Sequence, residues 1–246
     1  MTSEAEALPP HLPLNAYYAS EAERRRFLGR VFDRTAGSYD WISSLLSLGT
    51  GELYRTYALR EHGLKPGDRM LDVATGTGLL AQAASRLGAK VVGLDPSAGM
   101  LRQAAERRRF QLSRGIAERL PFGDGAFDIL TMGYALRHVA DLSGTFLEYR
   151  RVLKPGARLL ILDFAKPGNP VAYGVTRVFM KMLVPALSRF FAGGREAELL
   201  MRYCWDTVDQ SVPPSVIAPA LERAGFRELR VRTWAGVFVE YAAARP

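Results

Sequence analysis

Short apolar runs alternate with amphipathic stretches through the middle of the chain. The apolar runs are five or six residues long, as in strands buried on both faces, and cover 69–73, 90–95, 127–132 and 158–163. The stretches with helical spacing of apolar residues cover 79–87, 97–109 and 142–153. Strands and helices that alternate in this way predict a Rossmann-like α/β fold, a doubly wound, mostly parallel sheet with helices on both faces.

The N-terminal part has a different pattern. Residues 1–16 contain three prolines and predict a loose arm. Residues 22–48 show helical spacing that breaks around Gly37. We therefore expect an N-terminal arm and a helical cap over residues 1–60.

The remaining residues, 61–246, are expected to form the main domain. Its C-terminal end holds two runs typical of strands, 227–235 and 237–241, which meet at Gly236. A glycine between two such runs indicates a turn, so these strands would form an antiparallel edge of the sheet.

Residues 171–191 are apolar enough to raise the question of a membrane span. Four residues interrupt the segment at regular spacing: Arg177, Lys181, Pro185 and Arg189. A spanning helix would not tolerate them, so we expect an amphipathic helical lid over the sheet, at about 170–205. An interfacial helix that docks on a bilayer remains an alternative.

Composition narrows the class of protein. A length of 246 residues with 48% hydrophobic and 24% charged residues fits one globular domain with a small addition. The single cysteine, Cys204, excludes an intramolecular disulfide framework and fits a reducing cytoplasm. The three histidines, His11, His62 and His138, are scattered and give no support for a metal site.

The net charge of +8 has two interpretations. It could attract the chain to anionic lipid or nucleic acid, or it could reflect an arginine-rich composition that keeps the protein soluble. The basic residues occur in short groups such as Arg24-Arg25-Arg26, which favours the second interpretation. The expected location is cytoplasmic, and contact with the inner face of the cell membrane remains an option.

A glycine loop after the first expected strand carries the main chemical signal. It reads Asp72-Val73-Ala74-Thr75-Gly76-Thr77-Gly78 and leads into a helix, so its amides can approach a ligand closely. A loop that binds a dinucleotide would read G-x-G-x-x-G and would grip a pyrophosphate, which Asp72 would repel. The same carboxylate suits the ammonium of a methionine moiety, which favours S-adenosylmethionine over NAD.

Further candidate contacts follow in the order that such a cofactor requires. Asp95 ends the second strand, where a carboxylate can accept both ribose hydroxyls, and Met100 can pack on an adenine face. The loop at Ile116-Ala117 would close around the adenine, and Tyr39 would lie near the methionine end. The full set of predicted cofactor-binding residues is Tyr39, Asp72, Thr75, Gly76, Thr77, Gly78, Asp95, Met100, Ile116, Ala117 and Gly133.

Over nearly its full length the chain resembles the ubiquinone/menaquinone-biosynthesis C-methyltransferase family. The stretches that carry the resemblance are Val31-Phe32-Asp33, Tyr39-Asp40, Ser47-Leu48-Gly49, Leu71 to Gly78, Leu120-Pro121-Phe122, Leu136-Arg137-His138-Val139, Arg151-Val152-Leu153-Lys154-Pro155-Gly156 and Asp163-Phe164-Ala165-Lys166-Pro167. The resemblance implies methylation of a ring carbon of a polyprenylated quinol.

The chain departs from the family pattern and resembles a divergent member. Gly51, Glu52 and Tyr54 stand where the family usually has a His-Arg pair and a tryptophan. Ile116 replaces a polar residue, Gly133 a serine and His138 an asparagine. These departures concern the acceptor more than the cofactor, because adenine contacts can come from backbone amides.

Methylation of a ring carbon needs a base and a group that stabilises an oxyanion, because the carbon is a poor nucleophile until the adjacent hydroxyl loses its proton. Arg137 and His138 follow the expected strand at 127–132, on the edge where open α/β sheets hold ligands. A neutral imidazole is available near pH 7, whereas arginine stays protonated. We therefore expect His138 to be the base and Arg137 its electrostatic partner.

Other functions remain open at this point. The chain could be an O- or N-methyltransferase that acts on another metabolite. For each of these enzymes the expected partner is a small-molecule acceptor. An RNA or protein methyltransferase is disfavoured, because no appended RNA-binding module or Asn/Asp-Pro-Pro-aromatic motif is present, so we expect no nucleic-acid partner. A cofactor-binding protein without catalysis and a homodimer are further options.

Overall fold

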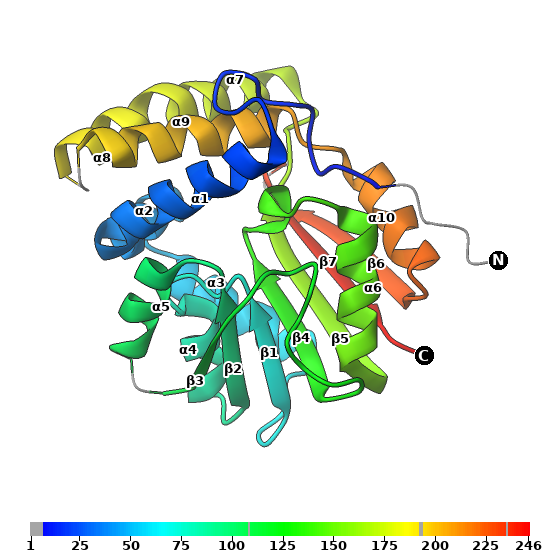
Figure 1. Ribbon diagram of the computed structural model, residues 1–246. Helices are drawn as coiled ribbons and strands as arrows, with labels where there is room; N and C mark the ends of the chain where they lie inside the picture. Colours follow the sequence, from blue (N-terminus) through cyan, green and yellow to red (C-terminus); the bar gives the residue numbers. More distant parts are fainter. Residues whose placement is uncertain (1–6, 108, 192–193, 235) are drawn as a thin grey trace.

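A seven-stranded sheet forms the centre of the described part of the chain, in the order β3-β2-β1-β4-β5-β7-β6 (Figure 1). The computed structural model describes residues 7–107, 109–191, 194–234 and 236–246; predictions that fall on residues 1–6, 108, 192–193 and 235 lie outside this range. The strands are β1 (Arg69–Val73), β2 (Lys90–Asp95), β3 (Gln111–Arg114), β4 (Phe127–Gly133), β5 (Leu153–Phe164), β6 (Arg227–Trp234) and β7 (Phe238–Ala244). Strands β1 to β5 are parallel, whereas β7 is antiparallel to both β5 and β6. The predicted fold class is confirmed.

Helices cover both faces of the sheet, as the apolar strand pattern requires. The flanking helices are α3 (Gly51–Glu61), α4 (Leu79–Arg86), α5 (Ala98–Ala105), α6 (Leu142–Val152) and α10 (Pro214–Arg223). Neighbouring strand residues alternate between the two cores: Met70 packs on the side of α3 and α4, and Leu71 on the side of α6 and α10. Helix α3 falls in the range expected for the cap, and its buried Ala58 and Leu59 join the core on the sheet.

A second layer of helices lies across the carboxyl ends of the strands (Figure 1). It consists of α1 (Glu21–Thr35), η1 (Ala36–Ser38), α2 (Tyr39–Leu46), α7 (Pro170–Val178), η3 (Phe179–Leu183), α8 (Val184–Phe191) and α9 (Arg195–Asp209). The layer has its own apolar core, in which Val31 and Ile42 of the cap pack with Val184 and Leu200 of the lid. The break expected around Gly37 is the 3₁₀ turn η1 between α1 and α2.

The lid helix contains one π turn, η3, between α7 and α8. The amide of Val184 donates to the carbonyl of Phe179, five residues earlier. Pro185 follows directly and has no amide proton to donate, which breaks the regular ladder at this point. Met180, in this turn, points toward the interior and is buried. No helix of the described ranges is long and apolar enough to span a bilayer.

The N-terminal arm is packed where the structure describes it. His11 forms a bridge with Ser211, and the amide of Leu142 donates to the carbonyl of Leu8 at 2.9 Å. Leu14 is buried against the core of the cap and lid. The expectation of a loose arm is therefore wrong for residues 7–16, because the buried Leu14 and the hydrogen bond to Leu8 anchor the arm to the domain.

Candidate active site

A cavity of about 560 Å³ lies between the carboxyl ends of the strands and the layer formed by the cap and lid. It is lined by all but one of the residues that the sequence singled out: Tyr39, Asp72, Thr75, Gly76, Thr77, Asp95, Met100, Ile116, Ala117, Gly133, Arg137 and His138. Gly78 is the exception. The fold thus brings together residues from segments that are far apart in the sequence.

The glycine loop turns sharply between β1 and α4. Gly76 and Gly78 have φ of +57° and +83°, and Ala74 also has a positive φ of +54°. A Cβ at Gly78 would lie 2.5 Å from the Phe110 ring, so this glycine serves close packing and not the cavity. Gly76 and Thr77 remain on the cavity wall.

Two buried carboxyl groups mark the ends of β1 and β2. Asp72 accepts hydrogen bonds from the hydroxyls of Thr75 (2.6 Å) and Thr131 (2.7 Å). Asp95 accepts from the amides of Gly76 and Ser97, both at 2.8 Å. Burial raises the pKa of each carboxyl to about 6, against the opposing effect of these hydrogen bonds. A cationic or hydroxyl-bearing ligand would favour the ionised form of both.

The cap is tied to this loop by the Tyr39-Asp40 motif. Asp40 accepts from the Thr77 hydroxyl at 2.5 Å and pairs with Arg107 at 2.5 Å. Arg107 also donates to the carbonyl of Thr77. Tyr39 itself is half-buried on the cavity wall, and desolvation there raises its pKa above the ordinary value.

Two of the stretches that carry the resemblance, Leu136-Arg137-His138-Val139 and Asp163-Phe164-Ala165-Lys166-Pro167, meet at one ion pair. Arg137 forms a buried pair with Asp163 through Nη1, and its Nε donates to Thr207 at 3.3 Å. The guanidinium also lies over the Phe164 ring, 5.4 Å from its centroid. Its Nη2 makes no hydrogen bond with the described residues. Much of the Arg137 charge is therefore already balanced within the protein.

His138 lies between two aromatic rings in the cavity wall. Its ring stacks on Tyr203 at 5.6 Å between centroids and meets Phe32 edge-on at 5.4 Å. Burial, followed by the positive charge of Arg137, lowers the pKa of His138 well below its ordinary value. Its Nδ1 is buried and has no hydrogen-bond partner among the residues described. The imidazole is therefore neutral at pH 7, as the base hypothesis requires, but it is a weaker base than an exposed histidine.

Arg55 is a cavity residue that the sequence analysis missed. It lies on α3, is buried, and forms no ion pair or hydrogen bond within the described ranges; its Nε is fully enclosed. Burial lowers its pKa. A Cβ at Gly51 would lie 3.0 Å from Arg55 Nη1 and 2.8 Å from the Ser47 hydroxyl, so the missing side chain at Gly51 makes room for the guanidinium. That departure from the family pattern was the one sequence signal that pointed here.

Tyr134 is the second residue that was missed. It follows β4, lines the cavity and has a φ of +61°, which is unusual for a tyrosine and typical of functional sites. Burial raises its pKa to about 12. Arg55 lies close enough to oppose that shift, so the two residues share one part of the cavity.

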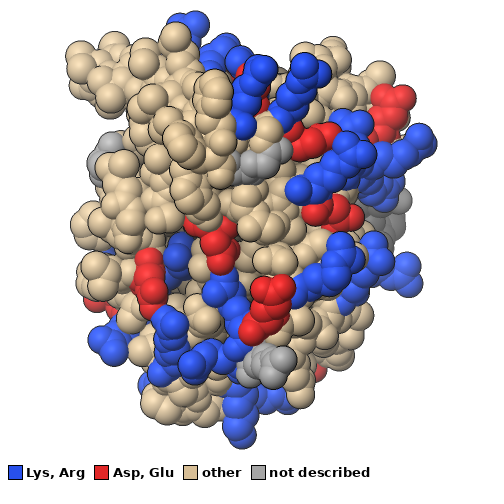
Figure 2. Space-filling model, turned by 90° about the vertical axis from the view of Figure 1, so that its left-hand side faces the viewer, with Lys and Arg blue, Asp and Glu red and all other residues tan. Residues whose placement is uncertain are grey.

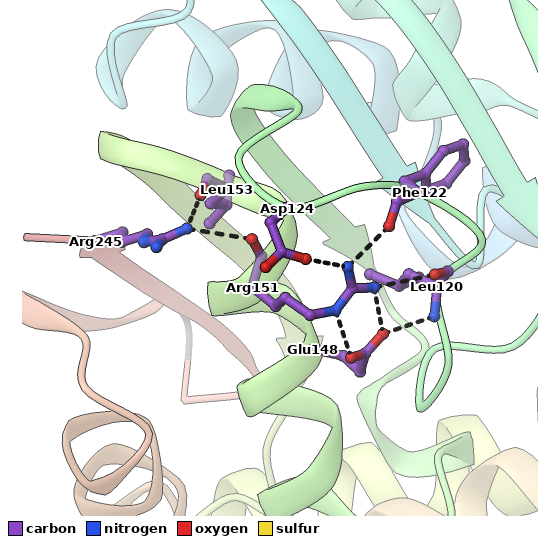
Figure 3. A network of polar contacts seen from close by, with 7 residues as sticks. All are labelled: Leu120, Phe122, Asp124, Glu148, Arg151, Leu153 and Arg245. Carbon is purple, nitrogen blue, oxygen red and sulfur yellow. Dashed lines mark hydrogen bonds and ion pairs between the residues drawn. The ribbon is translucent and has the colours of Figure 1, made fainter.

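A polar network fixes the loop that carries Ile116 and Ala117 (Figure 3). Arg151 of α6 donates to the carbonyls of Leu120 and Phe122, at 3.1 and 2.8 Å. It also pairs with Glu148 at 2.7 Å and Asp124 at 2.8 Å, and Glu148 accepts from the Leu120 amide. Arg245 donates to the carbonyls of Arg151 and Leu153. The Leu-Pro-Phe and Arg-Val-Leu-Lys-Pro-Gly motifs are thus joined structurally and hold one wall of the cavity.

The chemical groups of the cavity fit S-adenosylmethionine. Asp72 supplies an anion and Arg55 a cation for the two charges of an amino-acid moiety. Asp95 supplies a carboxylate at the position expected for ribose hydroxyls, and Met100 supplies an apolar contact. The unpartnered guanidinium of Arg55 is the observation that favours a ligand with a carboxylate.

Comparison with known proteins agrees with this assignment. The chain is 35% identical to the ubiquinone/menaquinone biosynthesis C-methyltransferase UbiE of Syntrophotalea carbinolica, over 85% of this chain and 90% of that protein. It is 33% identical to the demethylmenaquinone methyltransferase of Mycolicibacterium gilvum, over 88% and 93%. It is 39% identical to the 2-phytyl-1,4-naphtoquinone methyltransferase of Synechocystis, over 65% and 71%.

Solved structures show the same fold. A SAM-dependent methyltransferase from Aquifex aeolicus aligns with a TM-score of 0.59 at 21% identity, over 83% of this chain and 98% of that one. Residues 19–244 match the ubiE/COQ5 methyltransferase family. The predictions of a methyltransferase and of S-adenosylmethionine as its cofactor are confirmed: the chain belongs to the ubiE/COQ5 family of S-adenosylmethionine-dependent methyltransferases.

Proposed function

We propose that this enzyme methylates a ring carbon of a quinol, or of a related phenol with a polyprenyl tail, in isoprenoid quinone biosynthesis. The names of its relatives support this class of acceptor. The observation that carries the proposal is the cavity itself, in which a neutral His138 and two arginines lie beside the glycine loop. Met180 and Phe164 give the same cavity an apolar wall suited to a ring and tail.

In this proposal the cavity holds the cofactor by its charges. Asp72 binds the ammonium, Arg55 the carboxylate and Asp95 the ribose hydroxyls. Tyr39, Ile116 and Ala117 enclose it, while Thr75, Gly76, Thr77 and Gly133 form the wall along which it lies. When bound, S-adenosylmethionine supplies an electrophilic methyl group on a good leaving group.

His138 and Arg137, on the other side of the cavity from the cofactor, activate the acceptor. His138 Nε2 accepts the proton of the ring hydroxyl, and the electron pair left on oxygen increases the electron density of the neighbouring ring carbon. With the cofactor bound, that carbon would take the methyl group as the methyl–sulfur bond breaks and S-adenosylhomocysteine leaves. The ring proton would then pass to water, which restores the aromatic ring as a phenolate, and His138 would return its proton to the oxygen. Arg137 Nη2 is available to stabilise the oxyanion, although the Asp163 pair reduces its net charge.

An anaerobic assay with S-adenosylmethionine and a reduced, short-tailed demethylated quinol tests this function. Mass spectrometry should show a product heavier by one methylene, with the added mass on the ring. Added mass on oxygen or on a nitrogen-bearing acceptor would instead establish the O- or N-methyltransferase alternative. No product with any phenolic acceptor, despite cofactor binding, would refute the proposal.

The location of the enzyme follows from the proposed acceptor. A polyprenyl tail partitions into a bilayer, so we include peripheral contact with the inner face of the cell membrane in the proposal. The enzyme itself would remain cytoplasmic. A homodimer stays a prediction, which light scattering of the purified protein would test.

A further inference from the structure

The outer face of the lid exposes an unusual number of large apolar side chains. Sixteen large hydrophobic residues are exposed in the described part of the chain, and seven of them lie in residues 170–191. These seven, which we call the lid face, are Val171, Val175, Val178, Met182, Leu183, Phe190 and Phe191. Phe190 and Val175 are 79% and 67% exposed, so core packing does not account for them.

The inner side of the same helix already has its partners. Met180, Val184 and Ser188 are buried, and Val184 belongs to the core shared with the cap. The lid is therefore apolar on both sides: one side packs on the protein and the other faces outward. Trp41 of the cap extends the outer side, because its ring lies 6.1 Å from that of Phe191.

The charged side chains within the lid segment 170–191 are all basic. Residues 170–191 contain Arg177, Lys181 and Arg189, all exposed, and no aspartate or glutamate. Arg189 pairs with Glu198, whereas Arg177 and Lys181 form no ion pair or hydrogen bond with any residue that the structure describes. On the face shown in Figure 2, an area without charged side chains lies at the upper left, with most Lys and Arg beside and below it.

We propose that the lid face is the surface by which this enzyme docks on an anionic bilayer. Apolar side chains flanked by basic ones match the acyl boundary and the anionic headgroups of a membrane surface. Residues 170–191 carry no acidic side chain that would set the register of a protein partner. This inference rests on the proposed function, because a polyprenylated acceptor would have to reach the cavity from a bilayer.

The lid also lies between the cavity and the proposed bilayer. Met180 lines the cavity on the inner side of the π turn, and Met182 and Leu183 of the same turn lie outside. A docked lid therefore separates the bilayer from the cavity by a single helix. A small movement at this irregular turn would let a tail pass while the ring enters the site.

Vesicle flotation with the full-length protein tests the proposal without any measurement of activity. The wild type should float with vesicles of equal parts phosphatidylcholine and phosphatidylglycerol, and less with phosphatidylcholine alone. The double variant V175D/F190D should lose flotation. The matched control Leu147→Asp, at an exposed leucine of α6 outside the lid, should float like the wild type. The variant R177Q/K181Q should bind anionic vesicles roughly fivefold more weakly for each charge removed.

Activity then separates this proposal from the proposed function. V175D/F190D should methylate a water-soluble, short-tailed quinol at the wild-type rate and lose turnover only on a long-tailed quinol in vesicles. A wild type that does not float, or a V175D/F190D variant that floats as well as L147D, would overturn the docking surface while the function still stood. Conversion of a dimer into a monomer by V175D/F190D, with flotation unchanged, would make the lid face an interface between copies and would also overturn it.

Discussion

Arg55 offers the sharpest test of how the cavity holds its ligand. The guanidinium is buried and has no partner in the part of the chain that the structure describes, at a position where Gly51 leaves space for it. Replacement by methionine keeps an unbranched side chain and removes the charge. If Arg55 binds the carboxylate of the methionine moiety, Arg55→Met should weaken the binding of ligands that carry this carboxylate. The affinity for ligands without it should stay unchanged.

The expected size of the effect follows from the loss of hydrogen bonds to a charged group. Such bonds contribute about 1.5–3 kcal/mol, which corresponds to roughly 10- to 150-fold weaker binding of S-adenosylhomocysteine. Binding of 5′-methylthioadenosine, which has no amino-acid part, should stay within about twofold of the wild type. Isothermal titration calorimetry with both ligands measures the difference directly.

Arg55→Met should also change the stability of the free protein in the opposite direction. An unpaired buried cation is costly, although the adjoining cavity gives it some solvation. A gain of about 1 kcal/mol on its removal would raise Tm by roughly 2–4 °C in a chain of this length. The variant should then be more stable than the wild type without ligand and gain less from S-adenosylhomocysteine.

The control is Arg60→Met, the same substitution at an exposed arginine on the same helix. It should change neither ligand affinity nor the Tm of the free protein. If Arg55→Met weakens the binding of both ligands equally, or of neither, Arg55 does not bind the carboxylate. Unchanged S-adenosylhomocysteine affinity with a lower kcat would mean that Arg55 acts on the acceptor instead.

Three further predictions concern Asp72 and Asp95, His138, and Arg151. Burial raises the pKa of Asp72 and Asp95 to about 6, so affinity for S-adenosylhomocysteine should fall as the pH drops through 6 and both become protonated. Titration calorimetry of Asp72→Asn should show weak binding that depends less on pH. An unchanged pH dependence of the affinity would contradict the role of Asp72. His138→Gln should lower kcat by at least about 100-fold and leave cofactor affinity unchanged. Because the pKa of His138 is lowered, wild-type turnover should not fall between pH 8 and the ordinary histidine pKa of about 6.5. Near-wild-type turnover by the variant would show that His138 is not the base. Arg151→Met should weaken cofactor binding and lower Tm by roughly 2–4 °C for each kcal/mol lost, as measured by thermal shift, whereas the exposed Arg195→Met should do neither.

The sheet was predictable because its parallel strands are buried on both faces and therefore read as apolar runs. Strand β3 (Gln111–Arg114) lacked this signal, since it is short and only half-buried at the edge. Helix α3 was assigned by position to the cap, although its buried residues pack on the sheet. The arm was expected to be loose because prolines suggest irregular backbone, which does not exclude burial of the residues between them.

The lining of the cavity was predictable where its residues lie at strand ends. Asp72 and Asp95 follow from the order of strands and loops alone. Arg55 could not be found in this way, because it does not lie at a strand end. The only local signal was Gly51, one turn earlier on the same helix, and the position of Arg55 beside the glycine loop depends on the tertiary packing of α3.

The cap motifs have a common structural role that couples the cap to the cofactor. Asp33 of α1 accepts from the Ser97 hydroxyl at 2.5 Å and from the Gly99 amide at 2.8 Å, at the start of α5. Asp40 binds Thr77 at the start of α4. Both aspartates thus hold the cap onto the loops that follow the strands carrying Asp72 and Asp95. A ligand that orders those loops would at the same time fix the cap and, through their shared core, the lid, so cofactor binding and closure over the acceptor are expected to stabilise each other.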